Sequence, residues 1–491
     1  MNNAEKLSEP VMMEQETAQC SENKSAETIN TLFYLQKRAF NKERYPSYES
    51  RVADLKLLKS AIHREKDNLL RALEQDFGYR SHDESMLGDI FSSLSSIDYT
   101  IKHLRRWMKP QKRKVGIVFQ PARAEIHYQP LGVVGIISPW NYPVFLTIGP
   151  LVAAIAAGNR AMIKVSEYTP ATNAVLVDML SSVFPRDKVH VVEGDANVAK
   201  SFSELPFDHL LFTGSTQVGR HVMLAAADKL VPVTLELGGK SPVIIDDKIP
   251  LNEAVKRFIY GKTMNAGQTC VSPDYIYCPN ERLDELVAEI SRRYESMYPS
   301  TLGNDKRTRV INPKQFQRLM GYLEEAQAQG AQVVHLGELD VQPEGCFMPL
   351  TLVLGASASM KVMQEEIFGP ILPILGYQDT QDVIDAINSN ARPLGLYVLS
   401  FDKGFQRRFL RETHAGGVCI NDAAFHVVVD DLPFGGVGDS GMGSYHGVEG
   451  FRTFSHCKSV LVRGKLFFSD MLFPPYGKKM HHLFYKFFVG E

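Results

Sequence analysis

The sequence is poor in the features that mark secreted, metal-binding or membrane-spanning proteins. Its six cysteines lie far apart, with no CxxC pair and no matching histidine spacing, so neither a disulfide framework nor a metal site is expected. No apolar stretch reaches the roughly 18 residues of a spanning helix. These absences predict a cytoplasmic protein in which any important cysteine is a free thiol.

Charge of one sign is also scarce. The formal net charge is -2, and the lack of long like-charge runs argues against nucleic acid or an acidic membrane as a partner. Residues 1–30 form a polar N-terminal extension without the apolar core of a signal peptide. In the tail after Gly464, several phenylalanines are interrupted by lysines, histidines and prolines. We expect this tail to pack on the body or on a neighbouring subunit, and a membrane-surface contact is the alternative.

What is present is a long chain of ordinary globular composition. Its 491 residues exceed the size of a single hydrophobic core, so two or more domains are expected. From about residue 48 to 108, apolar residues recur three and four apart, which predicts helices. Residues 115–118 and 124–128 are apolar or alternating segments on either side of Gln120-Pro121, which predicts a β-hairpin.

Strands and helices then alternate, as is typical of a parallel sheet wound with helices. Gly158-Asn159 is a signal for a helix C-terminus, and Thr169-Pro170 is a signal for the start of the next helix. Beyond Leu237 the alternation resumes and predicts a second α/β domain. The predicted strands are 133–137, 161–165, 189–192 and 210–212, and the predicted helices are 145–157, 170–183, 284–297 and 313–329.

Two glycine motifs compete for a phosphate-binding role. The segment 436–441 matches GxGxxG, but Pro433 and Gly435 precede it where a strand is required, so we interpret it as a loop. The segment 212–219, FTGSTQVG, follows a predicted strand and opens a predicted helix, whose N-terminal amides suit a pyrophosphate. By itself this motif also fits a plain strand-to-helix turn.

Three residues are candidates for chemistry, and each has a structural alternative. Cys270 is bracketed by small and turn-forming residues, although a cysteine is more often an inert buried thiol. Glu236 ends an apolar strand before two glycines, where it could be a base, a ribose-binding acid or a solvated strand-end residue. Asn141 follows another strand, where its amide could stabilise an oxyanion or be an ordinary loop residue.

Taken together, the motifs resemble one family, the aldehyde dehydrogenases. The similarity covers roughly residues 45–463, and the form of several motifs resembles the class 3 branch, which includes coniferyl-aldehyde-type members. The motifs, in chain order, are SPWNYP at 138, KVSE at 164, FTGSTQVG at 212, LELGGKSP at 235, GQTC at 267 and EEIFGP at 365.

The resemblance implies a mechanism. The Cys270 thiolate attacks the aldehyde, the Asn141 amide and the backbone N–H of Cys270 hold the oxyanion, and hydride passes to a nicotinamide cofactor. Glu236 then activates the water that hydrolyses the thioester. NAD is the expected cofactor, with NADP possible, because the carboxylate of Glu167 should repel a 2′-phosphate. The cofactor-binding residues implied by the resemblance are Trp140, Lys164, Glu167, Gly214, Ser215, Gly219, Leu237, Glu366 and Phe368.

The resemblance also implies a Rossmann-like cofactor-binding domain, a second α/β catalytic domain and a small β element that joins subunits into a homodimer. The expected substrate is an aromatic aldehyde such as coniferyl aldehyde, or a medium-chain aliphatic one. Two alternatives are a relative that transfers the acyl group to coenzyme A or phosphate, and a catalytically silent member. The expected divisions are 31–114 with 130–236 for the NAD-binding domain, 115–129 with 448–464 for the oligomerisation element, 237–447 for the catalytic domain and 465–491 for the tail.

Overall fold

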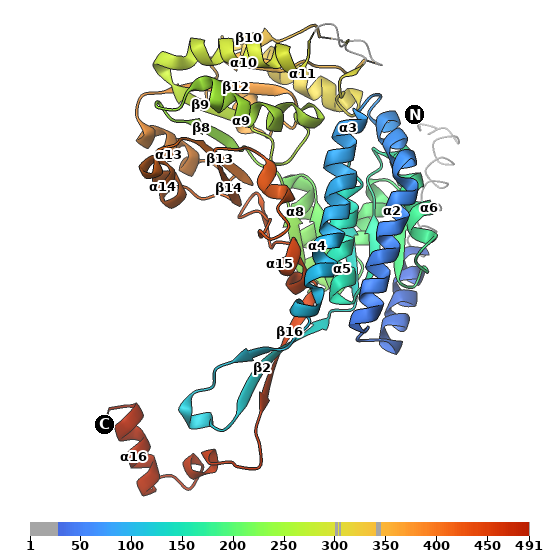
Figure 1. Ribbon diagram of the computed structural model, residues 1–491, viewed down its shortest axis with the longest axis vertical. Helices are drawn as coiled ribbons and strands as arrows, with labels where there is room; N and C mark the ends of the chain where they lie inside the picture. Colours follow the sequence, from blue (N-terminus) through green and yellow to red (C-terminus); the bar gives the residue numbers. More distant parts are fainter. Residues whose placement is uncertain (1–27, 300–302, 304–305, 340–344, 491) are drawn as a thin grey trace, which may run out of the picture.

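The computed structural model describes residues 28–299, 303, 306–339 and 345–490. Most of the predicted N-terminal extension therefore lies outside the described residues. The described chain is α/β: two sheets with covering helices form the body, and a narrow β arm projects from it and carries the C-terminal residues at its far end (Figure 1). The predicted α/β fold class is confirmed.

The first sheet follows the central part of the predicted strand-helix alternation. Within the described residues it has six strands in the order β15-β7-β6-β3-β4-β5, and all neighbouring strands are parallel except the pair β15 and β7. Its strands are β3 (Val133–Ile137), β4 (Arg160–Lys164), β5 (Val189–Val192), β6 (His209–Thr213), β7 (Val233–Glu236) and β15 (Gly441–Met442).

Helices cover both faces of this sheet, because its strands carry apolar side chains on both sides. One face packs against α2 (Tyr48–Asp76), α4 (Ser92–Trp107), α5 (Phe145–Ala157) and α6 (Pro170–Ser181). The other face packs against α7 (Ala196–Ser203), α8 (Thr216–Asp228) and the helical residues 28–42. The short helix α3 (His82–Ser85) and a π-helical turn (Met86–Phe91) lead into α4.

The second sheet lies beyond Leu237, as predicted, and forms the upper part of the body in Figure 1. Seven described strands have the order β10-β11-β12-β9-β8-β13-β14, and β10 is antiparallel to its neighbour. The strands are β8 (Pro242–Ile245), β9 (Tyr275–Pro279), β10 (Gln332–His335), β11 (Thr351–Leu354), β12 (Ile371–Tyr377), β13 (Gly395–Leu399) and β14 (Gly417–Ile420). The helices of this part are α9 (Leu251–Thr263), α10 (Leu283–Met297), α11 (Pro313–Ala328), α12 (Lys361–Gln364), α13 (Thr380–Ser389) and α14 (Lys403–Glu412). The helix α15 (Gly447–Thr453) packs instead against α4 and α5, beside the first sheet.

The arm is a three-stranded antiparallel sheet of β1 (Gln111–Arg113), β2 (Arg123–Pro130) and β16 (Ser455–Val462). The prediction of a strand at 115–118 is wrong: Ile117–Phe119 is a 3₁₀ turn. β2 pairs with Gln111–Arg113 instead, so the apolar segment falls in the connection and has no strand beside it. Strand propensity has no effect on its own without a pairing partner.

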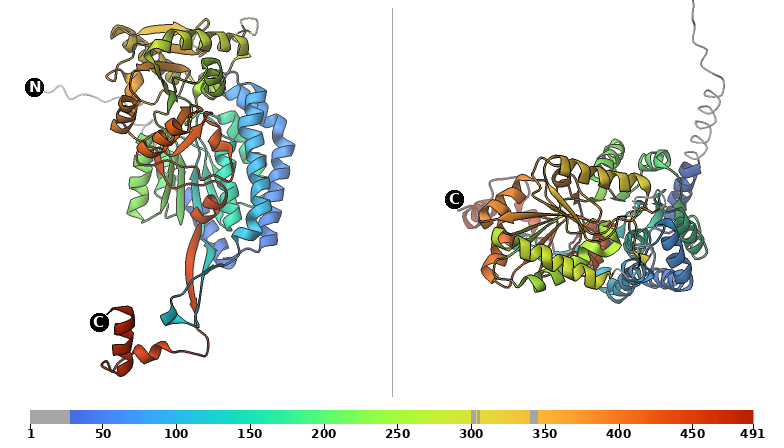
Figure 2. Two further views of the ribbon diagram at one scale, coloured as in Figure 1. Left: turned by 60° about the vertical axis from the view of Figure 1, so that its left-hand side comes forward. Right: turned by 90° about the horizontal axis from the view of Figure 1, so that it is seen from above.

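The C-terminal tail continues from β16 along the arm and ends in α16 (Lys479–Phe488) (Figure 2). Its side chains and the turn at Ile117 line an apolar groove of about 690 Å³. No helix in the described part of the chain combines the length and the apolar character that a bilayer crossing needs.

The boundaries of α5 and α6 use both local and distant groups. Gly158 ends α5 with a left-handed φ of 93°, as its position predicts. Thr169 precedes α6, as predicted, but its hydroxyl group bonds to Asn173 and not to the helix amides. The carboxylate of Asp76, the last residue of α2, accepts from the N–H groups of Ala171 and Thr172 at 2.9 and 2.8 Å. A residue almost a hundred positions away therefore caps α6, which local sequence cannot reveal.

A buried ion pair holds the start of α5. Asp89 and Arg80 are both fully buried, and their side chains approach to 3.0 Å. The other oxygen of Asp89 accepts from the N–H groups of Val144 and Phe145, each at 3.0 Å. The Arg80 guanidinium also lies over the ring of Tyr142, 4.8 Å from its centroid. These contacts support the chain directly after Asn141.

We predict that Gly158→Ala destabilises the protein by about 1–2 kcal/mol or more, because a side chain in the left-handed region is strained. The added Cβ would also lie 2.8 Å from the Arg51 guanidinium carbon. Gly321→Ala is the control: it lies inside α11 with nothing within 4 Å, and it should keep or raise stability. Thermal unfolding of both variants checks this, and an unchanged melting temperature for Gly158→Ala would contradict it.

Candidate active site

The candidate site lies at the carboxyl edge of the six-stranded sheet. β3 is the first of its strands in the chain; β4 and β5 continue on one side of it, and β6 and β7 on the other. The connections leaving β3 and β6 therefore turn in opposite directions, and such a switch point opens a crevice beyond the strand ends. Asn141 follows β3, Ser215 follows β6 and Glu236 ends β7, so strand polarity alone brings them to one edge.

A cavity of about 540 Å³ occupies this crevice and extends to the second sheet. This volume is in the range of small-molecule and cofactor sites. Eight of the residues singled out in the sequence line it, namely Trp140, Asn141, Gly214, Ser215, Glu236, Cys270, Glu366 and Phe368.

Cys270 lies on a strained loop between α9 and β9. Asn265, Ala266 and Gly267 all have left-handed φ angles of 53, 52 and 70°. A Cβ on Gly267 would come within 2.4 Å of the Gly369 carbonyl oxygen, so only glycine fits there. The hydroxyl group of Tyr397 donates to the carbonyl oxygen of Val271, directly after the cysteine. These constraints give the thiol one position at the cavity wall.

The electrostatic surroundings of Cys270 disfavour the thiolate. Burial, together with the charges of Glu366 and Glu236, raises the pKa of the Cys270 thiol to about 12. The backbone N–H groups of Cys270 and Val271 act in the opposite direction, because they donate toward the sulfur. A nucleophilic Cys270 therefore needs a base beside it or a positive charge brought in by a ligand.

Glu236 is such a base by position. It is buried at the end of β7, and neither of its carboxylate oxygens makes a hydrogen bond to a described residue. Burial raises the pKa of Glu236 well above its usual range. A desolvated carboxylate without a partner is costly in a structural role, and it is typical of groups that accept a proton.

Asn141 is held against the cysteine loop by its own amide. Its Nδ2 donates to the carbonyl oxygen of Gln268 at 3.1 Å, and Asn265 Nδ2 donates to the carbonyl oxygen of Asn141 at 3.0 Å. An amide nitrogen carries two N–H groups. The Asn141 amide therefore lies two residues from Cys270 along the loop and can donate a second hydrogen bond to a reacting oxygen.

Glu366 and Phe368 enter the cavity from the second sheet. The carboxylate of Glu366 lies directly over Gly238. A Cβ added at Gly238 would come within 2.0 Å of a carboxylate oxygen of Glu366. Burial and the charge of Asp274 raise the pKa of Glu366 to about 8, although a hydrogen bond from the Gly239 N–H lowers it in part. Phe368 has a left-handed φ of 48°, and its ring meets that of Trp140 edge-on at 5.2 Å. Such strain in a residue other than glycine is common at ligand sites.

Four of the predicted cofactor residues do not line this cavity. Lys164 is buried at the end of β4, where its ammonium donates to the carbonyl oxygen of Val165 at 2.6 Å, and burial lowers its pKa. Glu167 is exposed nearby. Gly219 and Leu237 pack on each other: a Cβ on Gly219 would lie 2.6 Å from a methyl carbon of Leu237.

The cavity also contains residues that sequence reasoning missed. Gln315, Arg318 and Tyr322 line it from α11. Arg318 donates to the carbonyl oxygens of Glu366 and Ile367 at 3.3 and 2.8 Å, so it supports the loop that carries Glu366. The spacing of three and four residues between these polar side chains was a usable signal, because it places them on one face of a helix.

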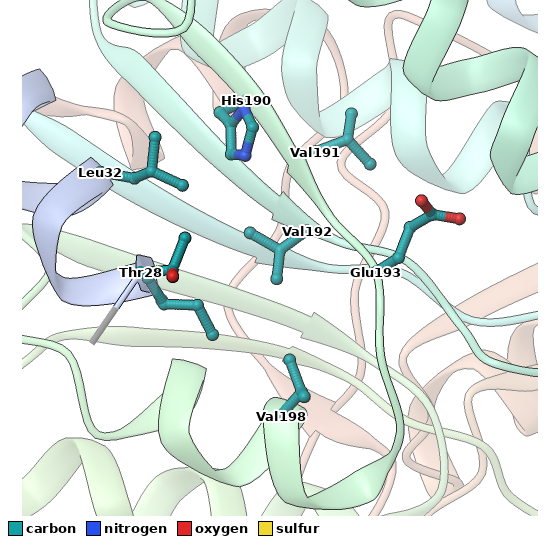
Figure 3. A pocket seen from close by; sticks show the side chains of 8 residues that line it. Thr28, Leu32, His190, Val191, Val192, Glu193 and Val198 are labelled. Atoms are coloured by element: carbon teal, nitrogen blue, oxygen red, sulfur yellow. The ribbon is translucent and has the colours of Figure 1, made fainter. Parts of the chain in front are cut away.

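A second hollow, of about 310 Å³, lies at the edge strand β5, apart from the cavity that contains Cys270 (Figure 3). Thr28 and Leu32 face Val192, Val198 and Glu193 across it, and none of the predicted site residues lines it.

Comparison with known proteins gives the context for this geometry. Residues 3–460 match the aldehyde dehydrogenase family. A probable coniferyl aldehyde dehydrogenase of Pseudomonas aeruginosa is 50% identical over 461 residues, covering 94% of this chain and 96% of the relative. The coniferyl aldehyde dehydrogenase of Pseudomonas sp. strain HR199 is 44% identical, covering 93% and 96%.

Solved structures agree with this. The substrate-bound AldH of Staphylococcus aureus superposes with a TM-score of 0.89 at 37% identity, covering 94% of this chain and 99% of that one. An aldehyde dehydrogenase of Mycobacterium tuberculosis in complex with NAD+ gives 0.81 at 28% identity, covering 90% and 92%. The family match covers most of the chain, and one relative from the same family is 50% identical to it. This chain therefore belongs to the aldehyde dehydrogenase family.

Proposed function

We propose that the protein oxidises an aldehyde to the carboxylic acid with NAD, or with NADP, through a thioester on Cys270. The observation that carries this proposal is the convergence of a thiol, an unpartnered buried carboxylate and an amide donor on one cavity, from Cys270, Glu236 and Asn141. Family membership supports aldehyde oxidation as the overall reaction.

In the first half of the reaction, the Cys270 sulfur attacks the aldehyde carbon. Because burial raises the pKa of its thiol, Cys270 must lose its proton to solvent as it attacks, and the positive charge of an oxidised nicotinamide, when bound, would favour that loss. The oxyanion that develops is held by the free N–H of the Asn141 amide and the backbone N–H of Cys270. The thiohemiacetal then loses hydride and becomes a thioester on Cys270.

In the second half, Glu236 removes a proton from water, which attacks the thioester carbon. The carbon–sulfur bond breaks, the sulfur leaves as the thiolate and the carboxylic acid is released. General-base assistance of this kind typically contributes about 10²–10⁴ in rate.

The crevice residues fit a dinucleotide. The N-terminus of α8, with Gly214 and Ser215 on the cavity wall, offers N–H groups and a positive dipole end to a pyrophosphate. Trp140 borders the same wall, and Glu366 and Phe368 border the end near Cys270. Lys164 and Glu167 would hold the adenosine ribose beyond the next strand end. When bound, the nicotinamide supplies the hydride acceptor.

The substrate we propose is an aromatic aldehyde such as coniferyl aldehyde, with a medium-chain aliphatic aldehyde as the second choice. Two relatives at 44 and 50% identity bear the coniferyl aldehyde name. We also propose a homodimer joined through the arm, because a three-stranded sheet and an apolar tail project together from the body and expose apolar side chains such as Leu466 and Phe487.

We keep the predicted domain division as a proposal. The cofactor-binding domain is 31–114 with 130–236, the catalytic domain is 237–447, and the bridging element is 115–129 with 448–464. The arm strands β2 and β16 lie in these last two ranges.

Transfer of the acyl group to coenzyme A or phosphate is disfavoured by Glu236. A base that activates water would hydrolyse the thioester before the acyl group could be transferred. A silent cofactor-binding role is disfavoured by the intact set of Cys270, Glu236 and Asn141.

Cys270→Ala should abolish NAD reduction with every aldehyde of a panel, because no other thiol of the described residues lines the cavity. The wild-type protein, assayed at 340 nm without coenzyme A or phosphate, is the reference. Turnover that survives the substitution contradicts the thioester mechanism. Turnover that requires coenzyme A or phosphate, or cofactor binding without turnover, supports the respective alternative.

Glu236→Gln should keep the first hydride transfer and lose steady-state turnover by about 10²–10⁴, because the thioester forms but hydrolyses slowly. Rapid-mixing absorbance at 340 nm, with intact-mass detection of the acyl group on Cys270, measures both. If the first turnover is lost as well, Glu236 acts mainly in the attack of the thiol.

Alkylation of Cys270 without cofactor should be slow at neutral pH. Below a pKa of about 12, the thiolate fraction of Cys270 and hence the rate should rise about tenfold per pH unit. Glu366→Gln removes one charge that raises this pKa, so above about pH 8, where Glu366 is ionised, Cys270 of the variant should be alkylated faster than in the wild type at equal pH. Peptide mapping after iodoacetamide treatment measures the rate, and a plateau below about pH 9 would refute the prediction.

A further inference from the structure

Tyr445 lies within the segment 433–447, whose form resembles the class 3 branch, but the resemblance assigned this residue no role. It follows the short strand β15, which pairs with β7 so that Gly441 lies opposite Glu236. Its ring packs against α5, 3.6 Å from the position of a Cβ on Gly149. Cys270 packs against the same buried cluster. Tyr445 therefore lies in the buried cluster that Cys270 packs against, shortly after the strand that pairs with the end of β7.

The hydroxyl group of Tyr445 has an unusual position. The residue is 2% exposed, yet its hydroxyl group makes no hydrogen bond to any described residue. By contrast, the buried Tyr397 and Tyr377 donate to the carbonyl oxygens of Val271 and Ile245. A buried phenol without a partner costs stability, so its retention points to a partner that arrives during the reaction.

The surroundings of this hydroxyl group indicate which partner that is. Burial, and then the charges of Glu236 and Cys270, raise the pKa of Tyr445 well above its usual range. The phenol is thus close enough to sense both groups, although it bonds to neither directly. It stays neutral, so it does not compete with Glu236 as a base. Among the described residues, the Tyr445 hydroxyl oxygen and both oxygens of Glu236 are buried without a hydrogen-bond partner.

We propose that Tyr445 is a positioning residue for hydrolysis of the thioester: its hydroxyl oxygen holds the attacking water together with the Glu236 carboxylate. The inference rests on the proposed thioester mechanism and deepens its second half. A buried water needs two or more polar partners to be held in place. One O–H of the water is donated to Glu236 and the other to Tyr445, which leaves a lone pair free to face the thioester carbon. As that oxygen attacks, Glu236 takes the proton and the Cys270 sulfur leaves.

The test is Tyr445→Phe, which removes only the hydroxyl oxygen. The first hydride transfer should stay within about twofold of the wild-type rate, and steady-state turnover should fall roughly tenfold, the effect of about one hydrogen bond. Intact-mass analysis should show more acyl group on Cys270 during turnover. Hydroxylamine, a nucleophile that needs no positioned water, should restore the rate. Tyr377→Phe, which also removes a buried hydroxyl group but far from the cavity, is the matched control.

Several results would overturn the inference. They are an unchanged steady-state rate, an equal loss in the first turnover and in the steady state, and a failure of hydroxylamine to accelerate the variant. A double variant with Glu236→Gln gives an independent check, because two groups that hold one water should lose less together than the product of their separate losses. If the wild-type protein forms no acyl group on Cys270, the thioester mechanism itself fails, which is distinct from a null result for Tyr445→Phe alone.

Discussion

The common direction of the parallel strands is the constraint on which the site depends. Because β3, β6 and β7 run the same way, the residues that follow them meet at one edge of the sheet. The strand order changes direction at β3, so the connections leaving β3 and β6 diverge and open that edge into a crevice. The helices on both faces and the buried Asp89–Arg80 pair keep this edge in place. The second sheet then adds Cys270 and Glu366 from the opposite wall.

Desolvation is the second force at work. The same burial raises the pKa values of the Cys270 thiol and of Glu366, and that of Glu236, so the cavity disfavours negative charge in general. A ligand that carries positive charge, or a reaction that moves a proton between these groups, relieves that cost. The site is therefore set up for proton transfer among neighbours and for anions that exist only during the reaction.

The support around Cys270 is more extensive than the motif suggests. Gln268 donates to the carbonyl oxygens of Asn265 and Arg309 and accepts from the N–H of Ile311, each at 2.9 Å, so it joins the cysteine loop to a separate segment. The left-handed residues before it shape the turn. The segment GQTC thus combines the thiol at the cavity wall with residues that fix the shape of the loop.

Much of this was readable from the sequence. Alternating apolar segments and end signals located most strands and helices around the first sheet, including the strand-turn-helix at Gly214, because burial and capping impose local patterns. Around the second sheet they located only the helices α10 and α11. The motifs also named eight residues that line one cavity. Local patterns failed at the segment 115–118, where the pairing partner of β2 lies elsewhere. Only the tertiary structure decided which distant groups each side chain contacts. Asp76 caps α6, and Arg318 supports the loop of Glu366. The Tyr445 hydroxyl group has no hydrogen-bond partner among the described residues, although it senses the charges of Glu236 and Cys270. These relations join residues far apart in the chain, and burial and electrostatics act through space, so no local pattern of residues encodes them.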